Sequence, residues 1–236
     1  MMATTHALFG VVLATATMGV APEFAPVALV AGVAGSVFPD LDLYAGHRRT
    51  LHYPVYYAVG AVGAVGLAVA VPIAETVGFA VFLAGAAAHS LMDVFGGGLE
   101  LRPWEAQSDR AVYDHYRGEW VPPRRWIRYD GAPEDLLVAA VFGAPAFVVW
   151  TAPTQTFVAA VLAVSAGYAL LRKPLAALVE RLVPHVPPSV RVHLPERFRE
   201  ESSGEMSRNE AGGDASASAA DVSESSVPAP RAESGD

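Results

Sequence analysis

The sequence predicts an all-α, polytopic membrane protein with about six transmembrane helices arranged as three hairpins. Two features of its composition point to this class. Apolar residues make up 53% of the 236 residues, and charged residues only 17%, against about 25% in soluble domains. The apolar residues also gather in long Ala, Val, Gly and Leu runs without strand-like alternation, which favours helices over strands.

Six apolar runs are expected to form the spans: residues 4–20, 24–38, 54–74, 76–95, 134–151 and 155–171. Short breaks at 21–23, 73–75 and 152–154 join them in pairs. The second run would be only about 22 Å long as a helix, short of a hydrocarbon core of about 30 Å. The sequence Arg172-Lys173-Pro174 is expected to end the last run. Residues 1–173 are therefore predicted to form one transmembrane domain, which includes a polar loop at 96–133.

The basic residues predict the orientation of this domain. Every Lys and Arg lies in loop 39–53, in loop 96–133 or in the C-terminal region, which the six-span arrangement places on the same side as the N-terminus. The positive-inside rule makes that side cytoplasmic. We therefore expect a multi-pass protein of the cell (inner or plasma) membrane with both termini in the cytoplasm.

The C-terminal region has a different composition. Residues 174–199 are expected to form an amphipathic, Pro-rich segment on the membrane surface. Residues 200–236 carry nine acidic residues and two arginines and are expected to form a disordered acidic tail. The preceding residues are nearly neutral and offer no basic face for nucleic acid. The absence of cysteine excludes disulfides, thiolate metal sites and a Cys nucleophile.

Polar side chains that can bind a metal are expected to meet at the cytoplasmic side. On the predicted topology seven of them reach one leaflet: His6, Asp40, Asp42, His47, His52, His89 and Asp93. His89 and Asp93 are four residues apart, so they share one helical face and can hold one ion. A carboxylate in an apolar helix costs about 3 kcal/mol. Either a metal ion or a tight His–Asp hydrogen bond would offset that cost.

Several motifs occur in an order that resembles a known family. They are Thr5-His6, Phe38-Pro39-Asp40-Leu41-Asp42, His47-Arg48-Arg49-Thr50-Leu51-His52, Ala88-His89-Ser90-Leu91-Met92-Asp93 and Gly97-Gly98-Leu99-Glu100-Leu101-Arg102-Pro103-Trp104. Over residues 5 to about 104 the chain resembles the YdjM-type inner-membrane metal-dependent hydrolases, which are distantly similar to zinc-dependent phospholipase C and P1-type nucleases. Arg49, Leu51 and Tyr53 replace the Gly, Thr and Ser usual in the family, changes that concern substrate contacts more than metal ligands.

The resemblance implies a divalent metal, zinc, held by His6, Asp42, His52, His89 and Asp93. Possible additional ligands are His47 and the pair His115 and Glu119, which has the His-x-x-x-Glu spacing of the zinc enzymes. From their chemistry, Arg48 and Arg49 could hold an anionic substrate group. Asp40 could act as a general base.

Three functions are compatible with these features. The first is a membrane-embedded metal-dependent hydrolase that acts on a phosphoester or lipid-like substrate at the cytoplasmic leaflet, in contact with membrane lipids. The second is a non-enzymatic integral membrane protein with a structural or sensing metal site. The third, a transporter, would place polar groups near the middle of the membrane and on both sides, whereas the far side has only Glu23 and Glu75. The sequence makes no prediction of oligomeric state.

Overall fold

A computed structural model describes residues 1–191 and 193–194 and confirms the all-α class. The α-helices are α1 (Ala3–Val20), α2 (Ala25–Val37), α3 (Pro54–Ala70), α4 (Ala74–Met92), α5 (Pro133–Gly143), α6 (Ala146–Val149), α7 (Ala152–Leu182) and α8 (Pro188–Arg191). Short 3-10 helices are η1 (Pro22–Phe24), η2 (Phe38–Tyr44), η3 (Asp93–Phe95), η4 (Pro103–Glu105) and η5 (Val183–His185). The strands β1 (Val112–Asp114) and β2 (Glu119–Val121) form a small antiparallel hairpin.

Helices α1 to α4 form a closely packed unit in which α2 lies against α1 and α4, and α4 also lies against α3. Glycines permit this packing. A Cβ atom on Gly35 would lie 2.1 Å from the carbonyl oxygen of Phe82, and one on Gly10 would lie 2.4 Å from that of Gly32. The helix backbones therefore touch directly, as small residues allow in membrane proteins.

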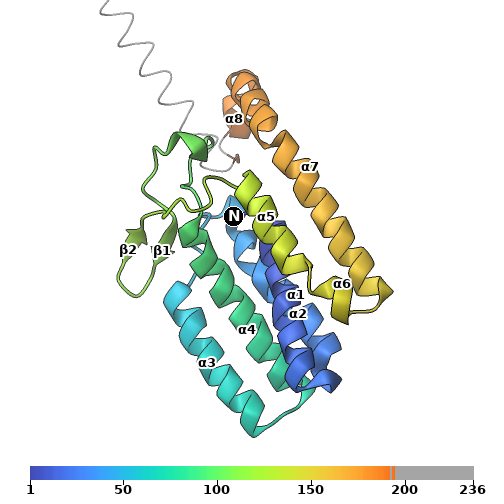
Figure 1. Cartoon of the computed structure of the whole chain (residues 1–236). Coiled ribbons are helices and arrows are strands. Elements are labelled where there is room, and N and C mark those ends of the chain that lie inside the picture. The colour runs from blue at the N-terminus through green and yellow to red at the C-terminus, as the bar shows by residue number, and fades with distance from the viewer. Residues whose placement is uncertain (192, 195–236) are drawn as a thin grey trace, which may run out of the picture.

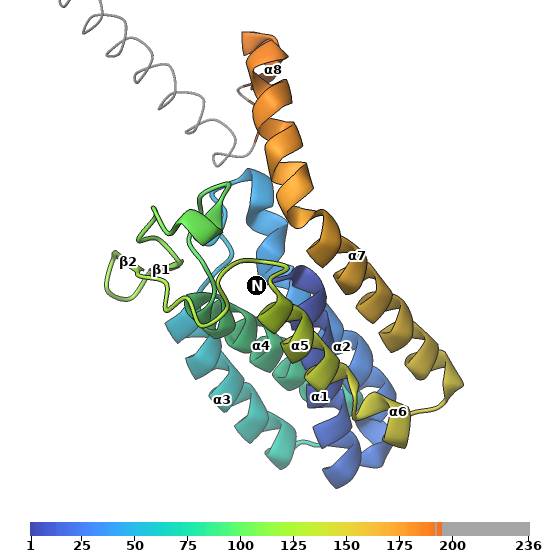
Figure 2. The same ribbon diagram turned by 45° about the horizontal axis from the view of Figure 1, so that its top comes forward.

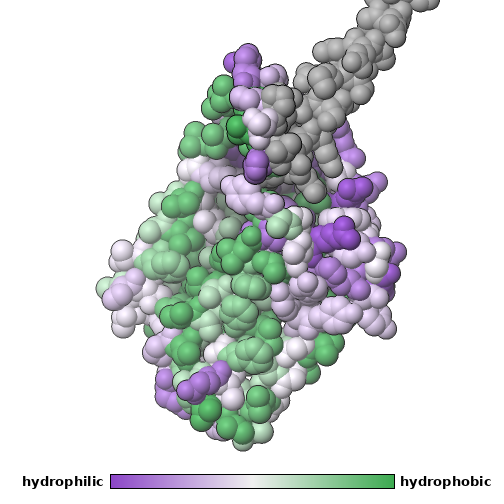
Figure 3. All heavy atoms as spheres, turned by 180° about the vertical axis from the view of Figure 1, so that it is seen from behind, coloured by the Kyte–Doolittle hydropathy of each residue, from purple (hydrophilic) through white to green (hydrophobic). Residues whose placement is uncertain are grey.

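The helices are arranged as hairpins, as the sequence predicts. In Figure 1 the connections α1–α2 and α3–α4 lie at the lower end of the molecule, and α6–α7 lies at its right edge. The N-terminus and the polar segments lie toward the other end. Seen from behind, the centre of the molecule presents a broad hydrophobic surface, and hydrophilic residues concentrate toward the upper right (Figure 3).

Four helical stretches are long and apolar enough to cross a membrane: Ala3–Val20, Pro22–Tyr44, Ala74–Phe95 and Ala152–His185. The second joins η1, α2 and η2 into 23 residues, or roughly 35 Å at the rise of an α-helix. The run that looked too short in the sequence is therefore long enough. Helix α3 is a shorter apolar helix of 17 residues. The total of six spans stays a prediction.

The fifth apolar run is interrupted, although the sequence predicts one helix over 134–151. Helix α5 has 11 residues and ends at Gly143, and α6 has four. Pro145 between them has no N–H to donate, and a proline ring disfavours a continuous helix. Beyond α6, the indole N–H of Trp150 donates to Thr15 Oγ1 of α1 at 2.8 Å, which fixes the broken end against the bundle.

The last helix does not end at Arg172-Lys173-Pro174, as the sequence suggests, but continues to Leu182. Contacts with loop 96–133 hold it on both sides of the proline. Arg172 Nε lies 3.0 Å from Asp130 Oδ2, and Glu180 pairs with Arg102. The predicted surface segment at 174–199 thus begins as part of α7. Its end and the predicted acidic tail at 200–236 lie outside the described residues.

The polar loop 96–133 contains more structure than its composition suggests. In the hairpin Val112 pairs with Val121 and Asp114 with Glu119. The backbone N–H of Tyr113 donates to the carbonyl oxygen of Arg48 at 3.0 Å. This bond attaches the hairpin to the loop before α3 and places it beside the polar cluster.

Candidate metal centre

The centre is built around the C-terminal end of α4, where His89 and Asp93 lie one turn apart. Both are 1% exposed. His89 Nδ1 donates to the carbonyl oxygen of Ser36 on α2 at 2.6 Å. Because that N–H is used, the neutral imidazole presents the lone pair of Nε2 toward Asp93, whose Oδ2 lies 3.5 Å away. The contact between α2 and α4 therefore orients a potential metal ligand.

His52, just before α3, is oriented in the same way by a carboxylate. Its Nδ1 donates to Asp42 Oδ2 at 3.0 Å, and its Nε2 lies 3.4 Å from Asp93 Oδ2. Asp42 also accepts hydrogen bonds from His47 Nδ1 at 3.0 Å and from the backbone N–H groups of Arg48 and Leu51. Asp42 thus lies behind His52 and fixes its ring, as carboxylates do behind metal-binding histidines.

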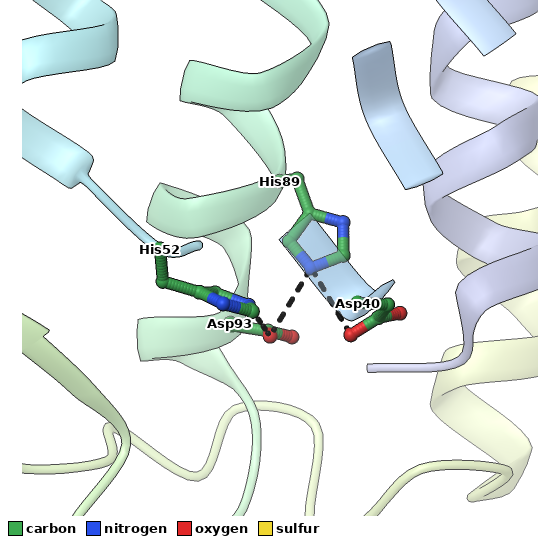
Figure 4. A group of neighbouring side chains, drawn as sticks. All are labelled: Asp40, His52, His89 and Asp93. Atoms are coloured by element: carbon green, nitrogen blue, oxygen red, sulfur yellow. Dashed lines mark ion pairs between the residues drawn. The ribbon is translucent and has the colours of Figure 1, made fainter. Parts of the chain in front are cut away.

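Asp40 completes a group of four that could hold a metal ion. It comes from η2, which follows α2 directly and has Pro39 in its first turn. Asp40 Oδ1 lies 3.4 Å from His89 Nε2. One ligand atom from each of Asp40, His52, His89 and Asp93 lies within 4.8 Å of the others. Figure 4 shows these side chains turned toward one another, with His89 and Asp93 on one helical segment and Asp40 and His52 on two others.

The spacing of these atoms fits a small ion. A tetrahedral zinc ion with bonds of about 2.0–2.1 Å separates its ligand atoms by about 3.3 Å. The three contacts from imidazole Nε2 to carboxylate oxygen measure 3.4, 3.4 and 3.5 Å. They exceed the range of about 2.7–3.2 Å for N–H···O hydrogen bonds. Among these four residues the distances therefore fit a shared ion better than direct His–Asp hydrogen bonds, while Asp93 also contacts His6 Nε2 at 3.2 Å and the Met1 amino group at 2.7 Å through its other oxygen.

Two buried ring nitrogens without hydrogen-bond partners support the same assignment. Within the described part of the chain, the Nε2 atoms of His52 and His89 are buried without a hydrogen-bond partner. An unsatisfied buried polar atom costs about 1–3 kcal/mol. In the neutral tautomers with hydrogen on Nδ1, both atoms carry lone pairs that face carboxylates, so a cation between them would turn an unfavourable contact into a favourable one. Two imidazole nitrogens and two carboxylate oxygens also suit zinc.

His6 lies beside this group but outside the set of four. Its ring stacks on that of His89, with centroids 3.8 Å apart, and its Nε2 lies 3.2 Å from Asp93 Oδ1. The amino group of Met1 contacts the same oxygen at 2.7 Å. Among the described residues, His6 Nδ1 has no hydrogen-bond partner. His6 can thus position Asp93 and His89, and its role as a further ligand stays a prediction.

Arg48 is buried and contacts both the centre and its surroundings. Its Nε lies 3.2 Å from Asp93 Oδ2, and its Nη1 donates to the carbonyl oxygen of Gly97 at 2.9 Å. Its backbone has φ = 59°, a left-handed conformation that is uncommon for a side chain other than Gly or Asn. Such conformations persist where surrounding contacts enforce them and are frequent at functional sites. Here the bond to Tyr113 and the bond to Asp42 enforce it.

The possible additional ligands have other surroundings. His47 donates to Asp42, and burial lowers its pKa below that of a free imidazole. His115 is half-buried, contacts the carbonyl oxygen of Arg49 through Nε2 at 2.6 Å and stacks on Tyr53. Glu119 is exposed on β2. The structure therefore brings His47 close to the candidate centre and places His115 and Glu119 in the hairpin beside it.

A cavity of about 410 Å³ adjoins the centre on the side of Asp40. Its polar lining includes Asp40, His47, Arg48 and Glu100, and its apolar lining comes from α1, α2, η2 and α7. The Asp40 side chain is 22% exposed, against 0–1% for those of His52, His89 and Asp93. Asp40 is therefore the member of the group through which a ligand in the cavity would reach the centre.

Sequence reasoning did not single out two supporting residues. Ser36 orients His89 through its backbone carbonyl, which has no signature in the sequence. Asp135 is fully buried and accepts hydrogen bonds from the Met2 backbone N–H, Thr5 Oγ1 and the Gly131 backbone N–H, at 2.7–3.0 Å. It fixes the start of α1, and with it His6, against α5. An acidic residue in the first turn of a helix is common, so Asp135 carried no special signal.

Fold and centre together define a helical membrane protein with a buried His/Asp cluster that could hold a metal ion. The YdjM inner membrane protein family matches residues 1–174, and the chain belongs to this family. No curated protein and no solved structure matches the chain.

Proposed function

We propose that this protein is a membrane-embedded, metal-dependent hydrolase that cleaves a phosphoester at the cytoplasmic leaflet. The observation that carries the proposal is the convergence of His52, His89 and Asp93 on one point beside a cavity that Asp40 enters. Catalytic zinc sites use three protein ligands and leave one position open. We assign His52, His89 and Asp93 as the ligands and place the open position on the side of Asp40.

The residues around the centre have separate roles in this proposal. A divalent ion, zinc by its ligand set, supplies Lewis acidity there, because it polarises a phosphoryl oxygen and lowers the pKa of water to about 7. Asp40 accepts a proton from the attacking water. Arg48 borders the cavity with a guanidinium group that suits phosphate oxygens. Asp42 keeps the His52 ring in place through its Nδ1.

The non-enzymatic alternative uses the same cluster as a structural or sensing metal site. It has one observation in its favour: Arg48 and the amino group of Met1 already neutralise the buried Asp93, as in a structural network. The two functions differ at Asp40. A structural site would use Asp40 as a fourth ligand and be closed to the cavity, whereas the hydrolase needs it free to accept a proton.

Asp40→Asn therefore separates the two functions. If the protein is a hydrolase, the variant keeps its metal and loses about 100-fold or more in phosphoesterase activity, the range for general acid–base groups. Asp109→Asn, which changes an 88% exposed carboxylate, serves as the control and keeps both. Loss of metal from Asp40→Asn, combined with no ester cleavage by the wild type, would favour the structural site.

We further propose that the polar end of the bundle faces the cytoplasm, with both termini on that side. The support is the position of the basic residues and the hairpin arrangement of the helices. The chain has no cysteine, so a single introduced cysteine can report which side of the membrane its position faces. Cysteines at Glu23, Glu75 and Thr151 should react with an impermeant reagent from outside, and those at Arg49 and Arg110 should not. External labelling at Arg49 would reverse the assignment of the leaflet.

A further inference from the structure

The cavity beside the candidate centre joins two chemical environments. Its lining includes the ionisable residues Asp40, His47, Arg48, Glu100 and Asp130. It also includes apolar side chains of α2, η2 and α7, among them Val37, Leu41, Leu43 and Val164. A ligand that fills the whole cavity must therefore have both a polar and an apolar part.

Two of the apolar lining residues are also exposed on the surface of helices that lipid would surround. Leu41 of η2 is 67% exposed and Val164 of α7 is 61% exposed. Figure 2 shows η2, the light-blue coil that follows α2, rising beside α7. Both residues lie in stretches that are long and apolar enough to span a membrane. Exposed apolar side chains on such helices face the hydrocarbon of the bilayer.

The position of Val164 along α7 supports access to the cavity from the membrane. Val164 precedes Arg172 by eight residues, which corresponds to about 12 Å along a helix. Arg172 binds Asp130 and the carbonyl oxygen of Leu101 in the polar loop, so it marks the level of the polar end. Val164 is therefore about 12 Å farther than Arg172 from the polar end, in the apolar part of α7 that lipid chains would surround.

The polar residues of the lining suit the head group of a phosphoester. Arg48 offers a guanidinium group beside the candidate metal ligands. Glu100 lines the same cavity, and among the described residues its Oε2 is buried without a hydrogen-bond partner. A carboxylate oxygen accepts hydrogen bonds, so it favours a head group with hydroxyl or ammonium donors. A volume of about 410 Å³ is within the range of about 300–1,000 Å³ for small-molecule sites.

We propose that the cavity is the binding site for a membrane lipid phosphoester, which enters sideways from the bilayer between η2 and α7. Its chain lies against Leu41 and Val164, its phosphate reaches Arg48 next to the candidate metal ligands, and hydrogen-bond donors of its head group face Glu100. This assignment rests on the proposed hydrolase function, since it names the substrate class of the same centre. It also makes α7 a wall of the substrate site, although α7 contributes none of the four clustered residues.

A chain-length experiment tests the assignment on the full-length protein in lipid nanodiscs. Two phosphodiester substrates share one chromogenic head group, and one carries a butyl chain and the other a hexadecyl chain. Val164→Trp fills the apolar part of the cavity. Leu170→Trp is the matched control, because Leu170 is on the same helix and 79% exposed but does not line the cavity.

We expect Val164→Trp to lower kcat/KM for the hexadecyl ester by about tenfold or more, since steric changes in an apolar pocket have effects of that size. The butyl ester should stay within about twofold of wild type, and Leu170→Trp should change neither. An equal loss for both esters, or no loss for the long one, would overturn the assignment even if hydrolysis itself is confirmed.

A binding measurement keeps this test independent of hydrolysis. A fluorescent hexadecyl phosphonate, which has no ester bond to cleave, is titrated onto wild type, Val164→Trp and Leu170→Trp. Saturable binding that Val164→Trp weakens and Leu170→Trp does not would support the cavity even if the wild type cleaves no ester, in which case only the hydrolase function fails. Equal binding to all three proteins would reject the cavity as the lipid site.

Discussion

The two halves of the helical domain are built differently. In α1–α4 the backbones touch at glycines, and this unit supplies all four clustered residues. In contrast, α5 and α6 are two short helices in place of one, and only 17% of the most apolar stretch of α7 is buried. A centre that must fix its side chains to within fractions of an ångström needs the first kind of packing. The side of a binding site that admits a ligand from the membrane needs looser packing, as in α5–α7.

The largest effect is expected where the packing is closest. Gly35→Ala would place a Cβ 2.1 Å from the carbonyl oxygen of Phe82, so α2 and α4 must separate. The adjacent Ser36 would then lose its contact with His89. We expect a loss of about 3 kcal/mol, typical of severe overpacking, measured by thermal unfolding in detergent, together with reduced metal content.

The control for this variant is Gly63→Ala on α3, where nothing lies within 4 Å of the added Cβ. It should unfold like the wild type or at a slightly higher temperature, since Ala favours helix over Gly. If Gly35→Ala and Gly63→Ala unfolded at the same temperature and held the same amount of metal, close backbone packing would not be what positions the centre.

A smaller effect is expected from the residue behind His52. Asp42→Asn keeps the shape of the side chain but weakens the hydrogen bond to His52 Nδ1 and no longer fixes the tautomer. Metal affinity should fall by about 10–100-fold, as for other residues that orient metal ligands. Competition with a fluorescent zinc chelator measures this change. Unchanged affinity would mean that His52 does not bind the metal through Nε2.

Much of this arrangement can be predicted from the sequence, because the patterns that indicate it lie within short stretches of the chain. The apolar runs and the turns between them predicted the hairpins, and His89 and Asp93 share a face by helical spacing alone. The continuation of α2 into η2 was not predictable, since Pro39 usually ends a helix. Likewise, the passage of α7 through Pro174 depends on Arg172 and Glu180 binding a loop that is remote in sequence.

Side-chain roles within the cluster were harder to predict than its existence. The resemblance to zinc enzymes made Asp42 a ligand and the chemistry of Asp40 made it a base, and neither role is tested by the fold. The structure adds distances that spacing cannot provide. Asp42 is 3.0 Å from His52 Nδ1, on the side away from Asp93, whereas Asp40 is 3.4 Å from His89 Nε2. Two residues apart on a 3-10 turn, they point to different neighbours.

The smallest effect is expected in the looser half. Arg172→Lys keeps the charge next to Asp130 but cannot also reach the carbonyl oxygen of Leu101, so it loses about one hydrogen bond, worth about 1 kcal/mol. Hydrogen exchange in α7 should become faster while metal content stays at the wild-type level. Arg181→Lys, at an exposed position of the same helix, serves as the control. A loss of metal from Arg172→Lys would show that the two halves are not independent.

The most direct test of the account is the metal content of the purified full-length protein, measured by mass spectrometry for wild type, His89→Ala and His185→Ala. His185 is exposed and lies outside the cluster, so its removal controls for nonspecific binding by histidine. We predict about one zinc ion per chain in the wild type and in His185→Ala, and none in His89→Ala. A wild type without metal after purification with added zinc, or a His89→Ala variant with a full complement, would contradict the account.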